Sequence, residues 1–96
     1  MKKFDRDGFS IRVKVNGDKM LYCLYDITKC LNIGSKGGNS IKEAIERAFK
    51  CKMSKVKIGK DDFSLIDDEQ LEYFLRIYST SADFNAFIRE IPYWHK

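Results

Sequence analysis

The stretch FSIRVKVNGDKMLYCLYDITKCLNI, residues 9–33, decides the fold class of this chain. Its first eight residues alternate apolar and polar side chains, which is the period of a strand with one buried face. Asn16-Gly17 follows, a pair typical of a type I′ turn, so the stretch predicts a β-hairpin. The return strand, MLYCLY, is apolar on both faces, which indicates a central strand or one covered on its second side by helices.

A short helix is expected where this return strand ends, because the apolar period changes there from two to about 3.6 residues. Asp26 can cap this helix, and Ile27, Cys30 and Leu31 can form its buried side. The helix should end before Gly34.

The strongest helix signal begins at Ser40. Ser40 and Glu43 match a capping box, and the preceding segment, GSKGGNS, is expected to be a loop at the mouth of the helix. The apolar residues that follow recur at helical spacing: Ile41, Ala44, Ile45, Ala48 and Phe49.

The second half of the chain predicts another hairpin and two more helices. MSKVKIG alternates, GKDD is typical of a turn, and FSLI can form the return strand. Asp67 with Gln70 resembles another capping box. The buried stripe of the helix it opens consists of Leu71, Phe74, Leu75 and Tyr78. A last helix, capped by Thr80 or Ser81, is expected to stop at Pro92. Its buried stripe consists of Phe84, Phe87, Ile88 and Ile91.

Together these elements predict a single α+β domain over residues 1–96, in which two β-hairpins form a small antiparallel sheet packed with about four short helices. A chain of 96 residues can build one core, and no separate effector domain is expected. No apolar run approaches the ~18 residues that span a bilayer, and the start lacks the apolar segment of a signal peptide. The chain is therefore expected to be soluble and intracellular.

The sequence offers little of what enzymes use. Its one histidine is His95, near the C-terminus, so histidine-based catalysis is not expected. Cys23, Cys30 and Cys51 lie in apolar patterns without metal-ligand spacing, which indicates reduced core cysteines. The acids after residue 60 lack the spacing of an EF-hand loop and are better explained as helix caps and turn residues. We expect no catalysis, no metal and no cofactor.

Charge is distributed in two blocks. From Lys36 to Lys60 there are eight basic residues and two acids, a net of +6, and from Asp61 to Glu72 there are six acids and no base, a net of −6. If the blocks project apart, the basic block suits an anionic partner. The alternative is that the two blocks fold against one another.

The GSKGGNS loop is a candidate phosphate-binding site. It matches neither the P-loop pattern nor G-x-G-x-x-G. Free amides at a helix N-terminus, glycines that allow close approach, and the nearby Lys36 and Lys42 can nevertheless hold one phosphate of a nucleic-acid backbone. The alternative is a connector whose glycines only shape the turn.

The order of these elements resembles the BRO-N domain, the N-terminal module of baculovirus repeated-ORF proteins and many phage antirepressors. The matching residues near the start are Ile11, Arg12, Val13, Gly17, Tyr22, Asp26 and Leu31. The segment SLIDDEQLEYFLRIYSTSADFNAFIREIPYW is similar to the family's two helices joined by a Ser turn. Its matching residues are Leu71, Tyr73, Leu75, Ser79, Ala82, Phe84, Phe87 and Ile88. Phe87 stands where the family commonly has tryptophan.

The resemblance implies a DNA-binding domain of viral or prophage origin, similar to antirepressors and other transcription regulators. We therefore expect a module that binds nucleic acid, with double-stranded DNA as the expected target, in the host cytoplasm; homo-oligomerisation is left open. The predicted contact residues are Lys36, Asn39, Ser40, Lys42, Arg47, Lys50, Lys52, Lys55 and Lys57. The basic residues should mostly contact phosphates, whereas Asn39 and Arg47 are the expected base readers. The alternative function is a small viral protein that binds a repressor or host protein, through the acidic block or the PYWHK tail, without contacting DNA.

Overall fold

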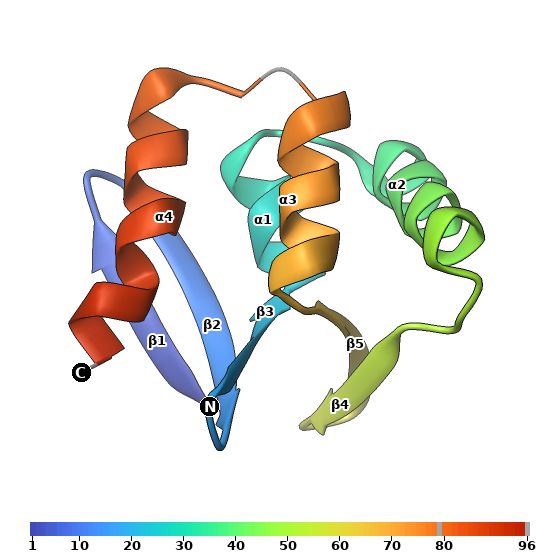
Figure 1. Cartoon of the computed structure of the whole chain (residues 1–96), viewed down its shortest axis with the longest axis horizontal. Coiled ribbons are helices and arrows are strands. Elements are labelled where there is room, and N and C mark those ends of the chain that lie inside the picture. The colour runs from blue at the N-terminus through green and yellow to red at the C-terminus, as the bar shows by residue number, and fades with distance from the viewer. Residues whose placement is uncertain (79, 96) are drawn as a thin grey trace.

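The described part of the chain folds into an antiparallel sheet and four helices (Figure 1). The computed structural model describes residues 1–78 and 80–95, and of residues 94 and 95 only the backbone. The elements are β1 (Lys2–Arg6), β2 (Phe9–Asn16), β3 (Lys19–Cys23), α1 (Leu24–Cys30), α2 (Ser35–Phe49), β4 (Ser54–Ile58), β5 (Asp61–Ile66), α3 (Asp68–Ile77) and α4 (Ala82–His95). The predicted α+β class, antiparallel sheet and four helices are thus confirmed. None of the helices in the described residues has both the length and the apolar character needed to cross a membrane.

The sheet has the strand order β1-β2-β3-β5-β4. Both predicted hairpins are present, as β2–β3 and β4–β5. In the first hairpin Asn16 pairs with Lys19, so the turn is centred on Gly17 and Asp18 rather than on Asn16 and Gly17. Of these two central residues only Gly17 has a positive φ, 64°. The predicted type I′ turn is therefore wrong, and glycine stands at the first central position, where a type II′ turn requires it.

Strand β1 was not predicted. It pairs with β2 through a two-residue turn, Asp7-Gly8, in which φ is 53° and 85°. Positive φ at both central residues is what a type I′ turn requires, and Asp-Gly is one of its preferred pairs. The strand itself carries one apolar side chain, Phe4, opposite Ile11 of β2. It was missed because alternating hydrophobicity is the main signal of a strand, and this charged edge strand scarcely has it.

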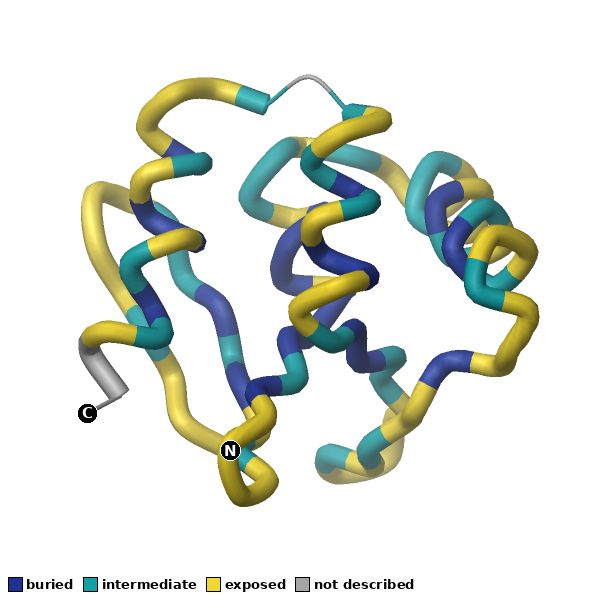
Figure 2. Tube along the Cα trace, in the orientation of Figure 1, coloured by how far each residue is buried: buried dark blue, intermediate teal, exposed yellow. Residues whose placement is uncertain are grey.

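The core lies between one face of the sheet and helices α3 and α4, and it continues to Ile27 of α1 and to Ile41 and Ile45 of α2 (Figure 2). Ile11 and Val13 of β2 are fully buried. The predicted stripe of α4 is buried as well: Phe84, Phe87, Ile88 and Ile91. The ring of Phe9 lies 5.5 Å from the rings of both Phe84 and Phe87, so α4 packs directly on β2.

Helix α1 fills a gap in the sheet between β2 and β5. Strand β3 pairs with β5 over only two residue pairs, Tyr22 with Ile66 and Cys23 with Leu65, and the chain then turns into α1. Next to α1, the first half of β5 and the N-terminal half of β2 are therefore not bridged by a strand. Helix α1 lies between them and contacts both strands. The backbone N–H of Arg12 accordingly donates to the side chain of Asp26 in α1, at 2.8 Å.

This contact corrects the role expected for Asp26. The N-cap of α1 is Cys23, which makes no side-chain capping bond, and Asp26 lies inside the first turn. The Asp26 side chain is buried because it binds a neighbouring strand, an interaction that no local pattern reveals. The expected buried side of the helix is present, with Ile27 fully buried and Cys30 and Leu31 packed at the edge of the core.

The expected start of α2 was also wrong. The helix begins at Ser35 with Gly34 as N-cap, so the predicted loop forms the first turns of the helix and Ser40 is not a cap. A close contact explains the glycine at position 37, since a Cβ atom there would lie 2.6 Å from the Cγ2 atom of Ile33. Glycine therefore lowers helix propensity but allows the helix to pack on the connection from α1. Further along, Ile41 and Ile45 are buried as predicted.

The two C-terminal helices follow the sequence signals more closely. The capping box of α3 is confirmed: the Gln70 N–H donates to Asp67 at 2.8 Å, and the Asp67 N–H donates to the Gln70 side chain at 3.0 Å. Ser81 caps α4 by accepting a hydrogen bond from the Phe84 N–H at 3.1 Å. Pro92 does not stop α4, which continues to His95. A proline in the last turn removes one backbone donor but still has a φ that suits a helix, so the turn can close around it.

Candidate functional site

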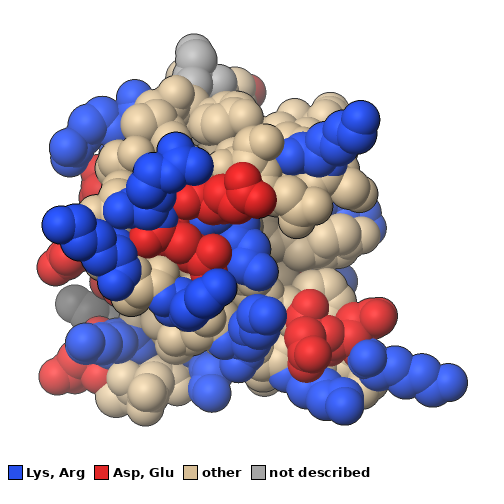
Figure 3. All heavy atoms as spheres, turned by 90° about the vertical axis from the view of Figure 1, so that its right-hand side faces the viewer, with Lys and Arg blue, Asp and Glu red and all other residues tan. Residues whose placement is uncertain are grey.

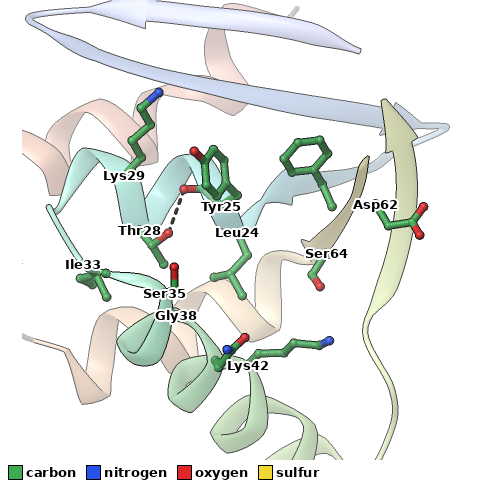
Figure 4. Close-up of a pocket in the computed structure, with 13 residues that line it drawn as sticks. Leu24, Tyr25, Thr28, Lys29, Ile33, Ser35, Gly38, Lys42, Asp62 and Ser64 are labelled. Carbon is green, nitrogen blue, oxygen red and sulfur yellow. Dashed lines mark hydrogen bonds between the residues drawn. The ribbon is translucent and has the colours of Figure 1, made fainter. Parts of the chain in front are cut away.

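Two hollows lie on either side of Tyr25. The first, of about 450 Å³, lies between α1, the first turns of α2, and β5 (Figure 4). The second, of about 570 Å³, lies between α1 and the β1–β2 hairpin. Tyr25 and Lys29 line both hollows, so this single turn of α1 forms the ridge between them. We refer to the first hollow as the α1–α2–β5 pocket.

The floor of the α1–α2–β5 pocket is aromatic. Tyr25 has 51% of its surface exposed, and among the described aromatic side chains only Tyr93 is more exposed. Its ring centroid lies 5.5 Å from that of Phe63 on β5, at an interplanar angle of 57°. The Lys29 Nζ atom lies 5.9 Å from the Tyr25 centroid, within the range of a cation–π contact. The pocket therefore offers an accessible π surface next to a cation.

The Arg12–Asp26 pair holds this floor in place. The Arg12 guanidinium donates two hydrogen bonds to the Asp26 carboxylate, Nε to Oδ2 at 2.8 Å and Nη2 to Oδ1 at 2.9 Å. These bonds raise the pKa of Arg12, which stays charged. The guanidinium carbon also lies 4.6 Å from the centroid of Phe63. One arginine thus links β2, α1 and β5, and it fixes the two elements that carry Tyr25 and Phe63.

The rim of the pocket is polar and carries both signs of charge. Asn39 and Lys42 line it from α2, and Asp62 and Ser64 line it from β5. In Figure 4 Lys42 extends from α2 toward the β5 side, with Tyr25 on the opposite side of the pocket. The rim can therefore accept and donate hydrogen bonds around the apolar floor.

The structure separates the residues predicted to form the phosphate-binding site. Asn39 and Lys42 line the pocket, whereas Lys36 and Ser40 are exposed and do not line it. The reason is the earlier helix start, because residues 36, 40 and 47 then share one stripe of α2. Lys42 and Arg47 are five positions apart, about 140° around the helix, so their side chains point in different directions.

The other predicted contact residues lie outside the pocket on exposed surface. They are Arg47, Lys50, Lys52, Lys55 and Lys57. Lys50 ends α2 in the left-handed conformation, with φ of 52°. Lys55 and Lys57 are two positions apart on the edge strand β4 and therefore share one face.

The two charge blocks meet in the β4–β5 hairpin. Lys57 pairs in register with Asp62, and Lys55 pairs with Ser64. Figure 3 shows acidic groups among the lysine and arginine side chains on the face formed by the right-hand side of Figure 1. The alternative in which the blocks lie against one another therefore applies to this hairpin.

The sequence did not identify Tyr25, Lys29 or Phe63 as site residues. Tyr25 was placed in the return strand MLYCLY, but the strand ends at Cys23 and the helix that follows turns Tyr25 outward. The signal available was the change of period near Asp26, which could have placed Tyr25 and Lys29 one turn apart on an exposed helix face. Nothing in the sequence indicates that Phe63 lies beside them.

The cysteines form no part of this site as ligands or as a disulfide. All three are free: Cys23 is buried, Cys30 is half-buried, and Cys51 is exposed. The prediction that all three are core residues is therefore wrong for Cys51, which lies in the loop after α2. Burial raises the pKa of the Cys23 and Cys30 thiols. Among the described residues no cluster of three or more His, Cys, Asp or Glu side chains could hold a metal.

The side chains of Trp94 and His95, which belong to the PYWHK tail, lie outside the described residues. Ser79, one of the residues that match the BRO-N pattern, lies outside them as well. Comparison of the chain with family models, curated proteins and solved structures finds no match.

Proposed function

We propose that this chain is a nucleic-acid-binding module of the viral or prophage antirepressor kind, as its resemblance to BRO-N implies. The observation that carries the proposal is a run of exposed basic side chains on two consecutive elements, α2 and β4, and the loop between them. These residues are Lys36, Arg47, Lys50, Lys52, Lys55 and Lys57. We refer to them as the α2–β4 basic surface.

The physical support comes from the chemistry of a phosphate backbone. Each basic group that neutralises a phosphate releases a condensed counterion, so binding becomes tighter as salt is lowered. The side chains of the α2–β4 basic surface lie on a helix stripe and on a strand edge, where they can follow a backbone without entering a groove. Glu43 and Asp62 lie among them, which favours moderate affinity and little discrimination between sequences. Double-stranded DNA remains the proposed target because the resemblance implies it.

The experiment is a titration of duplex DNA at several salt concentrations, followed by fluorescence anisotropy. The variant Lys55→Glu with Lys57→Glu should bind every duplex more weakly and should lower the salt slope by roughly one to two units. The matched control is Lys3→Glu with Lys14→Glu, an equal change of charge on the hairpin at the opposite side of the sheet. The proposal fails if the Lys55/Lys57 variant binds like the parent, or if the parent binds no DNA at low salt.

A second candidate function is binding to a protein such as a repressor or host factor. The specific observation in its favour is that β4 is an edge strand, paired on one side with β5. Such an edge can add a strand from a partner through backbone hydrogen bonds. This candidate would be preferred if a purified protein partner bound the chain at high salt while the parent showed no affinity for DNA.

A further inference from the structure

We propose that the α1–α2–β5 pocket binds one nucleotide, that is, a flat heteroaromatic base that carries a phosphate. This inference goes beyond the proposed function, because it rests on the chemistry of the pocket and not on the α2–β4 basic surface. The nucleotide can be a free mononucleotide or an unstacked nucleotide within a strand, and both present the same chemical groups to the pocket.

The size and the floor of the pocket suit a base. Its volume of about 450 Å³ lies within the ~300–1,000 Å³ of small-molecule sites. Leu24 is buried in its floor, and beside it stands the half-exposed ring of Tyr25, tilted against Phe63. A base that stacks on such a ring removes apolar surface from water on both partners, and it does so whichever base it is.

The rim supplies partners for the rest of a nucleotide. Lys42 of α2 extends across the pocket and is the cation that a phosphate requires, whereas the amino group of Lys29 points away from Lys42 and lies near the ring of Tyr25 (Figure 4). Ser64, on the β5 side, has a hydroxyl that points toward the Lys42 side of the pocket (Figure 4) and can hydrogen-bond a sugar hydroxyl or the amino group of a base. Asn39 has the amide that can pair with the edge of a base. A simple anion lacks the flat ring that could stack on Tyr25, so the combination points to a nucleotide rather than to phosphate alone.

The aromatic floor of the pocket is also preorganised in the absence of a ligand. Arg12 holds Asp26 of α1 by two side-chain hydrogen bonds and lies 4.6 Å from the centroid of Phe63 on β5. Tyr25 is the residue before Asp26, and it lies next to Phe63. A site whose aromatic pair is fixed by an ion pair loses little conformational freedom when it binds.

The experiment uses the whole chain labelled with ¹⁵N, with three soluble probes: adenosine 5′-monophosphate, adenosine, and inorganic phosphate. Calorimetry gives the affinities, and amide spectra locate the ligand. We expect the monophosphate to shift the amides of residues around the pocket and to bind at least about 10-fold more tightly than adenosine or phosphate. A single-stranded hexanucleotide of deoxyadenosine distinguishes a strand from a free nucleotide as the source. Competition between the hexanucleotide and the monophosphate identifies the strand as a source, whereas binding of the monophosphate alone identifies the free nucleotide.

Matched variants separate stacking and charge from stability. Tyr25→Ala should weaken binding of the monophosphate by about 10-fold, as loss of one base–aromatic contact does. Tyr25→Phe, which keeps the ring, should bind like the parent. Lys42→Met should weaken the monophosphate but not adenosine, while Lys36→Met, on the exposed stripe of the same helix, should change neither.

The inference is overturned if none of the nucleotide probes shifts the pocket amides, if inorganic phosphate binds as tightly as the monophosphate, or if Tyr25→Ala leaves the affinity unchanged. Its failure can be distinguished from failure of the proposed function. The Lys55→Glu/Lys57→Glu variant should keep the affinity for the monophosphate while losing duplex DNA, because neither lysine lines the pocket.

Discussion

The Arg12–Asp26 pair should be one of the most costly interactions in the molecule to break. In Asp26→Ala, three donors of Arg12 lose their acceptor: Nε, Nη2 and the backbone N–H. The side chains are 28% and 10% exposed, so water can reach the orphaned guanidinium only in part. The variant should therefore fold with a charge and a backbone donor left largely buried.

The magnitude follows from the burial. Removing one partner of a buried ion pair costs about 3–5 kcal/mol, and the partial exposure of Arg12 favours the lower end, about 3 kcal/mol. A domain has ~5–15 kcal/mol of stability in total. The melting temperature should fall by roughly 12 °C or more, since each kcal/mol shifts it by about 4–8 °C in a domain of this size.

Urea unfolding followed by circular dichroism measures this cost. Glu72→Ala is the matched control, because Glu72 forms a similar two-bond pair with Arg89, in which both side chains are about half exposed. Exposed pairs contribute at most about 1 kcal/mol. The double variant Arg12→Met with Asp26→Ala should be more stable than Asp26→Ala alone, because it leaves no charge unpaired. The reasoning is refuted if Asp26→Ala costs no more than Glu72→Ala.

Three further outcomes are expected. Phe87→Ala should cost about 3–5 kcal/mol in urea unfolding, because this ring is 1% exposed in the core, and a loss below about 1 kcal/mol would mean that α4 is peripheral. Gly38→Ala should be more stable than Gly37→Ala, although both variants gain helix propensity. A Cβ atom at position 37 would lie 2.6 Å from the side chain of Ile33, whereas at position 38 the nearest atom would be 3.9 Å away. Equal melting temperatures of the two variants would contradict the close packing at Gly37. Burial raises the pKa of Tyr22 above its ordinary 10.0, so its contribution to stability is intact below pH 10 and is lost as the pH rises further. The stability difference between the parent and Tyr22→Phe should therefore shrink at alkaline pH, whereas the buried thiol of Cys23 titrates in both proteins and cancels.

The parts of the fold that the sequence predicts are those with local causes. The β2–β3 and β4–β5 hairpins follow from alternation and turn residues, and the α3 capping box consists of two side chains three positions apart. One error has a cause distant in the sequence, because Asp26 leaves its expected capping role to bind Arg12, 14 positions earlier. The early start of α2 is a different case, since the contact that favours glycine at position 37 is with Ile33, only four positions earlier.

The candidate site was predictable only in part for the same reason. Asn39 and Lys42 were identified because they follow a glycine-rich segment, which is a local signal. The aromatic floor joins Tyr25 of α1 to Phe63 of β5, and this contact exists only once the sheet is assembled. Tertiary placement, not residue type, turned an apparent strand residue into a site residue.

The short pairing between β3 and β5 affects how the chain folds and how the native sheet opens. The hairpins close locally, but the β3–β5 pairing consists of two residue pairs, Tyr22 with Ile66 and Cys23 with Leu65, whose members are more than 40 positions apart. Closing such a long loop is costly in entropy and slow, so formation of this pairing should be the slow step in assembly of the sheet. The same pairing should be the first part of the native sheet to open, and the amides of β4 and β5 should then exchange together ahead of those of β2. A ligand in contact with both Tyr25 of α1 and Phe63 of β5 would link the two sides of this pairing, and its binding energy would oppose that opening.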